Sequence, residues 1–122
     1  MIPIFEDTKI YVVAPARVAT GGPELLHQFV YCFRNILNID ANMYYIPEDQ
    51  PDPVHPFYLG YKNPYTREIE DSERNILVLP EVHSYIVFSR KFKNIRKIIW
   101  WLSVDNFLMS KFSYEHYLLY FI

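Results

Sequence analysis

Residues 9–14 read Lys-Ile-Tyr-Val-Val-Ala, a nearly continuous apolar run that ends at Pro15. A short run without polar alternation is typical of a central parallel strand that is buried on both faces. After a loop, Pro23 stands where a helix would begin, because proline is favoured at the first helical position. The sequence therefore predicts a strand followed by a helix.

Residues 23–38 carry apolar side chains at helical spacing, with polar side chains on the opposite face. The apolar stripe contains Leu25, Leu26, Phe29, Val30, Phe33, Ile36 and Leu37, and the polar face contains Glu24, His27, Gln28, Tyr31, Arg34, Asn35 and Asn38. A second strand is expected over residues 42–46. Strand, helix and strand at this spacing form a βαβ unit.

The second half of the chain continues this alternation. Residues 75–79 and 97–102 are apolar runs that predict two more strands, with a short helix over 81–89 between them. Residues 47–64 hold five of the nine prolines, which argues against a helix or a central strand there. We therefore expect an α/β fold: a single Rossmann-like domain over residues 1–122, its sheet mostly parallel, with helices on both faces.

The composition narrows the function classes. With 122 residues, of which 51% are hydrophobic, the chain is expected to form one domain with a real core. A net charge of −2 argues against nucleic-acid binding driven by phosphate neutralisation. The single cysteine allows no internal disulfide and no cysteine metal cluster. The absence of a signal-like start and of an apolar run of ~20 residues predicts no transmembrane segment and a cytoplasmic location.

Three polar segments follow predicted strands: residues 20–24, 80–83 and 103–106. Ligands of open α/β sheets bind outside the carboxyl ends of the strands, so these segments are expected to converge on one site. The candidate ligand-binding residues are Thr20, Gly21, Gly22, Glu81, Asp105 and Asn106.

The glycine pair allows a ligand to approach the backbone closely, and the helix that follows offers free N–H groups to an anion such as a diphosphate. The pair matches neither G-x-G-x-x-G nor a Walker A loop. Glu24 would repel a phosphate if it faced the ligand. A tight turn that caps the helix is the alternative role for Gly21 and Gly22.

Glu81 and Asp105 are the candidate catalytic residues, because a carboxylate at a strand end can act as a base or bind hydroxyl groups. Glu81 has an alternative role as favourable charge at a helix start. Asp105 and Asn106 have an alternative role in forming a turn or cap. The four histidines show no metal-ligand spacing, so neither a metal site nor a cofactor is expected.

Three blocks resemble GT-B glycosyltransferases of bacterial polysaccharide assembly. They are residues 13–28 around Ala-Thr-Gly-Gly-Pro-Glu-Leu-Leu-His-Gln, residues 75–81 (Asn-Ile-Leu-Val-Leu-Pro-Glu) and residues 97–106 (Lys-Ile-Ile-Trp-Trp-Leu-Ser-Val-Asp-Asn). The resemblance implies two Rossmann-like domains with a cleft between them: an N-terminal domain that receives the acceptor and a C-terminal domain that holds most of the sugar nucleotide. It would place Gly21 and Gly22 at the cleft, with Glu81, Asp105 and Asn106 near the acceptor.

The leading hypothesis is the acceptor-side domain of a glycosyltransferase in bacterial polysaccharide or glycan biosynthesis, with a sugar nucleotide and a glycan acceptor as partners. A chain of 122 residues leaves no room for the sugar-nucleotide half, so we expect it to be a truncated or separate domain, incomplete for catalysis alone. The alternative is a non-catalytic interaction or dimerisation module that keeps the fold. Its homodimer or partner-chain contact would be the aromatic segment 117–122.

Overall fold

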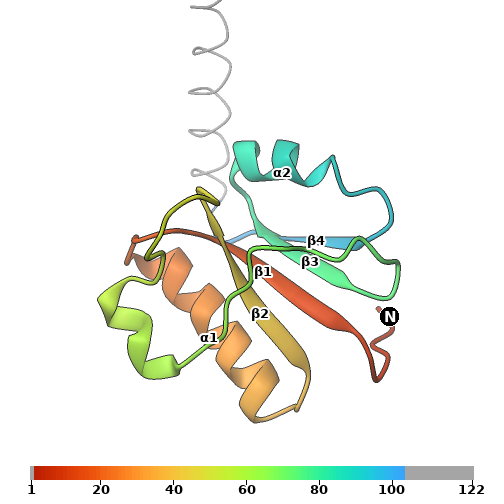
Figure 1. Cartoon of the computed structure of the whole chain (residues 1–122), viewed down its shortest axis with the longest axis horizontal. Helices are drawn as coiled ribbons and strands as arrows, with labels where there is room; N and C mark the ends of the chain where they lie inside the picture. The colour runs from red at the N-terminus through yellow and green to blue at the C-terminus, as the bar shows by residue number, and fades with distance from the viewer. Residues whose placement is uncertain (1, 104–122) are drawn as a thin grey trace, which may run out of the picture.

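Four parallel strands form one sheet in this computed structural model, which describes residues 2–103 (Figure 1). The strands are β1 (Lys9–Pro15), β2 (Asp40–Ile46), β3 (Ile76–Pro80) and β4 (Arg96–Trp100), and their order in the sheet is β2-β1-β3-β4. The expected α/β class is confirmed, and the sheet is parallel throughout. The predicted strand boundaries are correct to within two residues.

The two inner strands are buried on both faces, as their apolar runs predict. Residues 10–14 of β1 and all of β3 are buried. In the middle of the sheet Val12 pairs with Met43 on one side and with Val78 on the other. Because a parallel strand of this kind has no solvent-facing side, both faces of the sheet need a covering layer.

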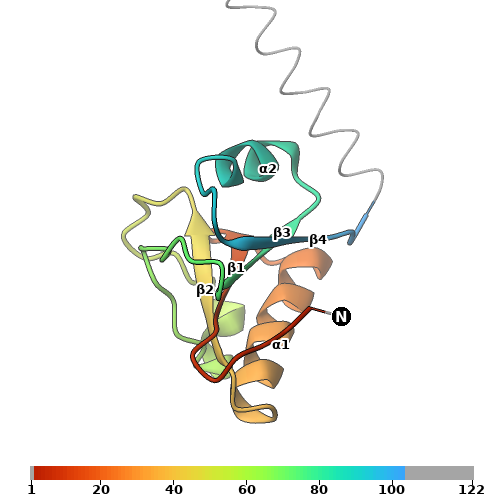
Figure 2. The same ribbon diagram turned by 90° about the vertical axis from the view of Figure 1, so that its right-hand side faces the viewer.

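Two helices on opposite faces of the sheet supply part of that cover (Figures 1 and 2). Helix α1 (Gly21–Asn35) packs Leu26 and Val30 against one face. Helix α2 (His83–Ser89) packs Tyr85 and Phe88 against the other. Side chains of β1 alternate between these two cores, with Val12 facing α1 and Val13 facing α2.

Helix α1 begins earlier and ends earlier than the predicted 23–38. The last helical hydrogen bond runs from the N–H of Ile36 to the carbonyl of Cys32 at 2.9 Å. The N–H of Leu37 donates to the same carbonyl, five residues back, at 3.2 Å, so the regular helical ladder stops there. Asn38 then adopts a left-handed conformation with φ 55°, which asparagine tolerates better than most residues. The predicted apolar stripe is accordingly too wide, since Leu25, Ile36 and Leu37 are exposed.

The long connection between β2 and β3 contains a 3-10 helix, η1 (Pro56–Tyr61), although its prolines argue against any helix. Pro56 is compatible with it because the first position of a helix needs no N–H donor. After η1 the chain runs along the outer edge of β2. There Met43 donates its N–H to Pro64 at 2.9 Å and accepts the N–H of Thr66 at 3.0 Å.

Residues 65–74 form no helix and cross the α2 side of the sheet as an extended strap, the green segment before β3 in Figure 1. The N–H of Glu70 donates to the hydroxyl of Tyr11 at 3.2 Å. The carboxylate of Asp71 accepts the backbone N–H groups of residues 93, 94 and 95, at 3.0, 2.9 and 2.8 Å. The strap is therefore fastened both to the sheet and to the turn before β4.

Leu77→Ala should lower the free energy of unfolding by about 2–5 kcal/mol, because Leu77 is 0% exposed in β3 and its truncation leaves a cavity. Leu59→Ala is the matched control, since Leu59 is 59% exposed and should change stability by no more than about 0.5 kcal/mol. Urea unfolding followed by circular dichroism measures both. Equal losses in the two variants would contradict the burial of β3.

Candidate functional site

The inner strands β1 and β3 are neighbours in the sheet, yet the chain leaves them toward opposite faces, into α1 and α2. Diverging connections of this kind open a crevice at the carboxyl ends of the strands, where ligands of open α/β sheets bind. A cavity of about 170 Å³ lies there. Its walls are formed by Pro15, Val18, Thr20, Gly22, Pro23, Leu26, Pro80, Glu81, Val82 and Leu102.

Of the predicted site residues, Thr20, Gly22 and Glu81 thus come together around one cavity, with Gly21 beside them. Residues 16–23, which lead from β1 into the first turn of α1, are here named the glycine loop. Asp105 and Asn106 lie outside the described residues, although Leu102, shortly before them, lines the cavity. Sequence reasoning missed the apolar wall made by Val18, Leu26, Val82 and Leu102, because apolar residues next to strands are ordinarily core.

Neither glycine is needed for the backbone conformation, since no glycine among the described residues has a positive φ. A Cβ added at Gly21 would meet nothing within 4 Å, and one at Gly22 would lie 3.5 Å from Leu102 Cδ1. The glycines therefore keep a surface open beside the start of α1. Thr20 precedes the helix in an extended conformation and makes no side-chain cap, so the first N–H groups lack that partner.

Glu81 is 2% exposed, and its Oε2 accepts the backbone N–H of Leu102 at 3.0 Å. Helix α2 starts at His83, with Val82 as its cap and no acidic residue in its first turn. Glu81 stands directly before this cap, so its alternative role as favourable charge at a helix start remains open. The carboxylate also ties the end of β3 to Leu102, the second residue after β4.

Glu24 does not line the cavity. Its Oε1 accepts hydrogen bonds from the hydroxyl of Tyr61 at 2.5 Å and from Gln28 Nε2 at 3.1 Å. These two donors hold the pKa of Glu24 below its ordinary value. The carboxylate is thus engaged with η1 and its own helix, which weakens the objection that it would repel an anion in the crevice.

The prediction that His27 lies on the polar face of α1 is wrong: the residue is 1% exposed. Its Nδ1 lies 2.6 Å from the carbonyl of Pro23, which can only accept, so Nδ1 carries the proton. Nε2 then accepts from the Tyr45 hydroxyl at 2.8 Å. The imidazole also stacks on Tyr58, with ring centroids 3.9 Å apart. The four-residue spacing to Pro23 was readable in the sequence, but the two tyrosine partners were not.

This buried cluster of His27, Tyr45 and Tyr58 holds the glycine loop at two points near the start of α1. The Tyr58 hydroxyl donates to the carbonyl of Thr20 at 3.3 Å, while His27 donates to that of Pro23. Removal from water lowers the pKa of His27, because burial disfavours the charged imidazolium. The hydrogen bond that positions the glycine loop at Pro23 therefore comes from a histidine that burial keeps neutral.

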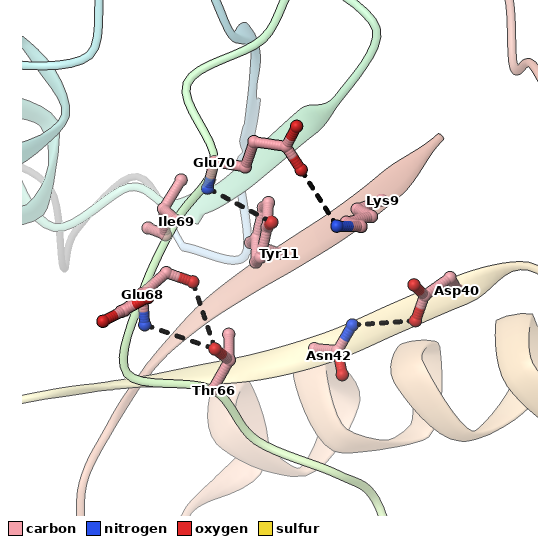
Figure 3. A pocket seen from close by; sticks show the side chains of 8 residues that line it. All are labelled: Lys9, Tyr11, Asp40, Asn42, Thr66, Glu68, Ile69 and Glu70. Carbon is pink, nitrogen blue, oxygen red and sulfur yellow. Dashed lines mark hydrogen bonds and ion pairs between the residues drawn. The ribbon is translucent and has the colours of Figure 1, made fainter. Parts of the chain in front are cut away.

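A second, larger hollow of about 450 Å³ lies at the amino ends of β1 and β2, under the strap (Figure 3). We name it the strap groove. Its lining residues are Lys9, Tyr11, Asp40, Asn42, Thr66, Glu68, Ile69 and Glu70. Sequence reasoning did not find it. The available signal was the pair of polar residues, Asp40 and Asn42, at alternate positions of an otherwise apolar strand.

Within residues 2–103, no three or more His, Cys, Asp or Glu side chains are grouped so that they could hold a metal ion. The helices in the same range are all too short or too polar to cross a bilayer.

Comparisons of this chain with protein-family models, with curated proteins and with solved structures found no match.

The burial of His27 gives a stability prediction with a definite sign. The unfolded state takes up a proton near the ordinary pKa of about 6.5, and the folded state resists it, so the contribution is fully present above that pH and is lost as the pH falls below it. The free energy of unfolding should therefore decrease below about pH 6.5, by at most about 1.4 kcal/mol per pH unit from this group.

Urea unfolding of the parent chain and of His27→Gln between pH 5 and about pH 7 tests this linkage. The variant should be less stable at neutral pH, because it loses the stacking on Tyr58, and should show a flatter pH dependence in this window. Parallel pH profiles for the two chains would contradict the burial of a neutral His27.

Proposed function

We propose that this chain is the acceptor-side domain of a GT-B-type glycosyltransferase acting in bacterial polysaccharide or glycan biosynthesis. In this proposal a second Rossmann-like unit supplies most of the sugar-nucleotide site. The observation that carries the proposal is the crevice between β1 and β3, where the glycine loop and Glu81 line one cavity. The likeness of residues 13–28, 75–81 and 97–106 to such enzymes supports it independently.

The crevice has two sides with different chemistry. On the α1 side, uncapped N–H groups at the positive end of a helix suit the phosphate or sugar of a donor that reaches across from the second unit. On the α2 side, the buried Glu81 offers a carboxylate to an acceptor hydroxyl. A carboxylate beside an acceptor hydroxyl is the arrangement that general-base activation requires.

The rigidity of the crevice also supports a binding role. His27 and Tyr58 fix the glycine loop, and the Leu102 N–H fixes the Glu81 carboxylate. Groups that are already held in place lose little conformational freedom when a ligand binds. The larger part of the wall is apolar, which matches small-molecule sites in which a few polar groups set orientation.

Gly21→Ala separates binding from folding. The added Cβ meets nothing within 4 Å, so the variant should fold and be more stable by up to about 1 kcal/mol, because alanine reduces the entropy of the unfolded chain. Gly60→Ala is the matched control, since a Cβ at Gly60 in η1 also meets nothing within 4 Å. Chemical-shift titrations with UDP-, GDP- and TDP-sugars and short glycans should show weaker binding for Gly21→Ala only.

In the parent chain the shifted signals should cluster at residues 20–22 and 81–82. A panel that perturbs none of these residues would count against a ligand crevice, as would equal weakening by the Gly60→Ala control.

Glu81→Gln tests the carboxylate itself. The amide oxygen can still accept the Leu102 N–H, so the thermal midpoint should move by only a few degrees. Loss of a charge-assisted hydrogen bond should weaken acceptor binding about tenfold. Unchanged affinity for every glycan that binds the parent chain would show that Glu81 has only the structural role.

A non-catalytic interaction or dimerisation module is the second candidate. Its expected contact segment, residues 117–122, lies outside the described residues. The observation that favours this candidate is the number of large apolar side chains on the described surface, including Leu25 on α1, Ile36 directly after it, Phe57 and Leu59 on η1, and Trp101 after β4. Exposed apolar groups in this number are common at protein interfaces. A solution mass that stays monomeric up to high concentration, measured by light scattering, would count against this candidate.

A further inference from the structure

The strap groove exists because of an unusual connection. Both faces of a parallel sheet are normally covered by crossover helices. Between β2 and β3 the extended strap takes the place of such a helix on the α2 side. The hollow of about 450 Å³ beneath it lies within the range of about 300–1,000 Å³ found for small-molecule sites.

Polar side chains face this hollow from strands that elsewhere are apolar. Asp40 and Asn42 on β2 alternate with the buried Ala41 and Met43, so they share the face that looks into the groove. Lys9 enters from β1, and Thr66 and Glu68 from the strap (Figure 3). A covered strand face would carry apolar residues at these positions, so the polar set matches a wetted, ligand-sized hollow.

Most of the charge in the groove is already balanced within the protein. Lys9 Nζ lies 2.9 Å from Glu70 Oε2, and Arg34 lies 3.2 Å from Asp40 Oδ1. Asp40 Oδ1 also accepts from Asn42 Nδ2 at 3.0 Å. These pairs hold the side chains in place and neutralise two of the three carboxylates in the groove, those of Asp40 and Glu70, while Glu68 is the third. A cationic ligand would therefore gain little binding free energy there.

Hydrogen-bonding capacity remains after these pairings. A carboxylate has about four acceptor positions, and an ammonium has three donors. Within the described residues, Asp40 Oδ2 and Asn42 Oδ1 accept no hydrogen bond. Thr66 Oγ1 donates its proton to the Glu68 carbonyl at 3.1 Å and accepts the Glu68 N–H at 3.2 Å, which leaves it one acceptor position. A ligand with many hydroxyl groups, each of which both donates and accepts, can satisfy such a mixed set without introducing charge.

We infer that the strap groove binds a short neutral saccharide at a site separate from the crevice between β1 and β3. The two sites lie at opposite ends of β1, so this inference does not depend on the proposed glycosyltransferase role. Asn42 orients the sugar hydroxyls through its amide oxygen and its second N–H, and the remaining lone pair of Thr66 Oγ1 accepts one more hydroxyl. The paired Lys9 and Glu70 line the groove beside them.

The test is a chemical-shift titration of the full chain with maltose, cellobiose, lactose and chitobiose. At least one disaccharide should shift the signals of Asn42, Thr66 and Glu68, with a dissociation constant of roughly 1 mM that is insensitive to salt. Asn42→Ala combined with Thr66→Val should weaken binding at least tenfold. Asn35→Ala is the matched control, because Asn35 lies on α1, outside the groove lining, and its amide donates to the carbonyl of Tyr31 in the same helix.

Thermal unfolding confirms that each variant is folded before titration. Three results would overturn the inference: no disaccharide shifts the groove signals, the shifts cluster at residues 20–22 and 81–82 instead, or the double variant binds as tightly as the control. Salt-sensitive binding of spermidine at the same residues, without any saccharide binding, would also overturn it and assign the groove to organic cations.

Discussion

The inner strands β1 and β3 are hydrogen-bonded to a parallel neighbour on each edge and buried on each face. That double burial constrains the rest of the molecule, because neither face of the sheet can be left to water. Helices α1 and α2 must therefore leave β1 and β3 in opposite directions, and the crevice between their first residues is a consequence of covering the core. The candidate site therefore lies in a crevice that the fold would form even without a ligand.

The two sides of the crevice are held by different means. On the α1 side, an imidazole and a tyrosine hydroxyl bind the carbonyls of Pro23 and Thr20. Burial also raises the pKa of Tyr45, so its hydroxyl keeps the proton that it donates to His27. On the α2 side, one carboxylate of Glu81 joins the ends of β3 and β4. Each side is thus anchored to residues that are distant in sequence. The geometry of the crevice therefore depends on the folding of the whole domain and not on the local sequence of one loop.

Local pattern was sufficient for the strands and for the place of the glycine loop. The runs at residues 9–14 and 75–79 are almost entirely apolar and are each followed by proline, so their composition alone predicts that they are buried. The burial of His27 could not be predicted in this way, because it depends on Tyr45, 18 residues away, and on Tyr58 in a proline-rich segment. The end of α1 depends on the backbone conformation near Asn38, and the strap groove depends on the extended course of residues 65–74. A single sequence does not reveal which side chains come into contact when long connections bring distant residues together.

The bridge between Met43 and residues 64–66 also covers part of one edge of the sheet. At the middle of β2, both outward backbone groups are already taken by Pro64 and Thr66, so this edge is closed to a new strand by the protein itself. A strand added beside Met43 would first have to displace Pro64 and Thr66, so the protein protects this edge of the sheet against edge-to-edge association.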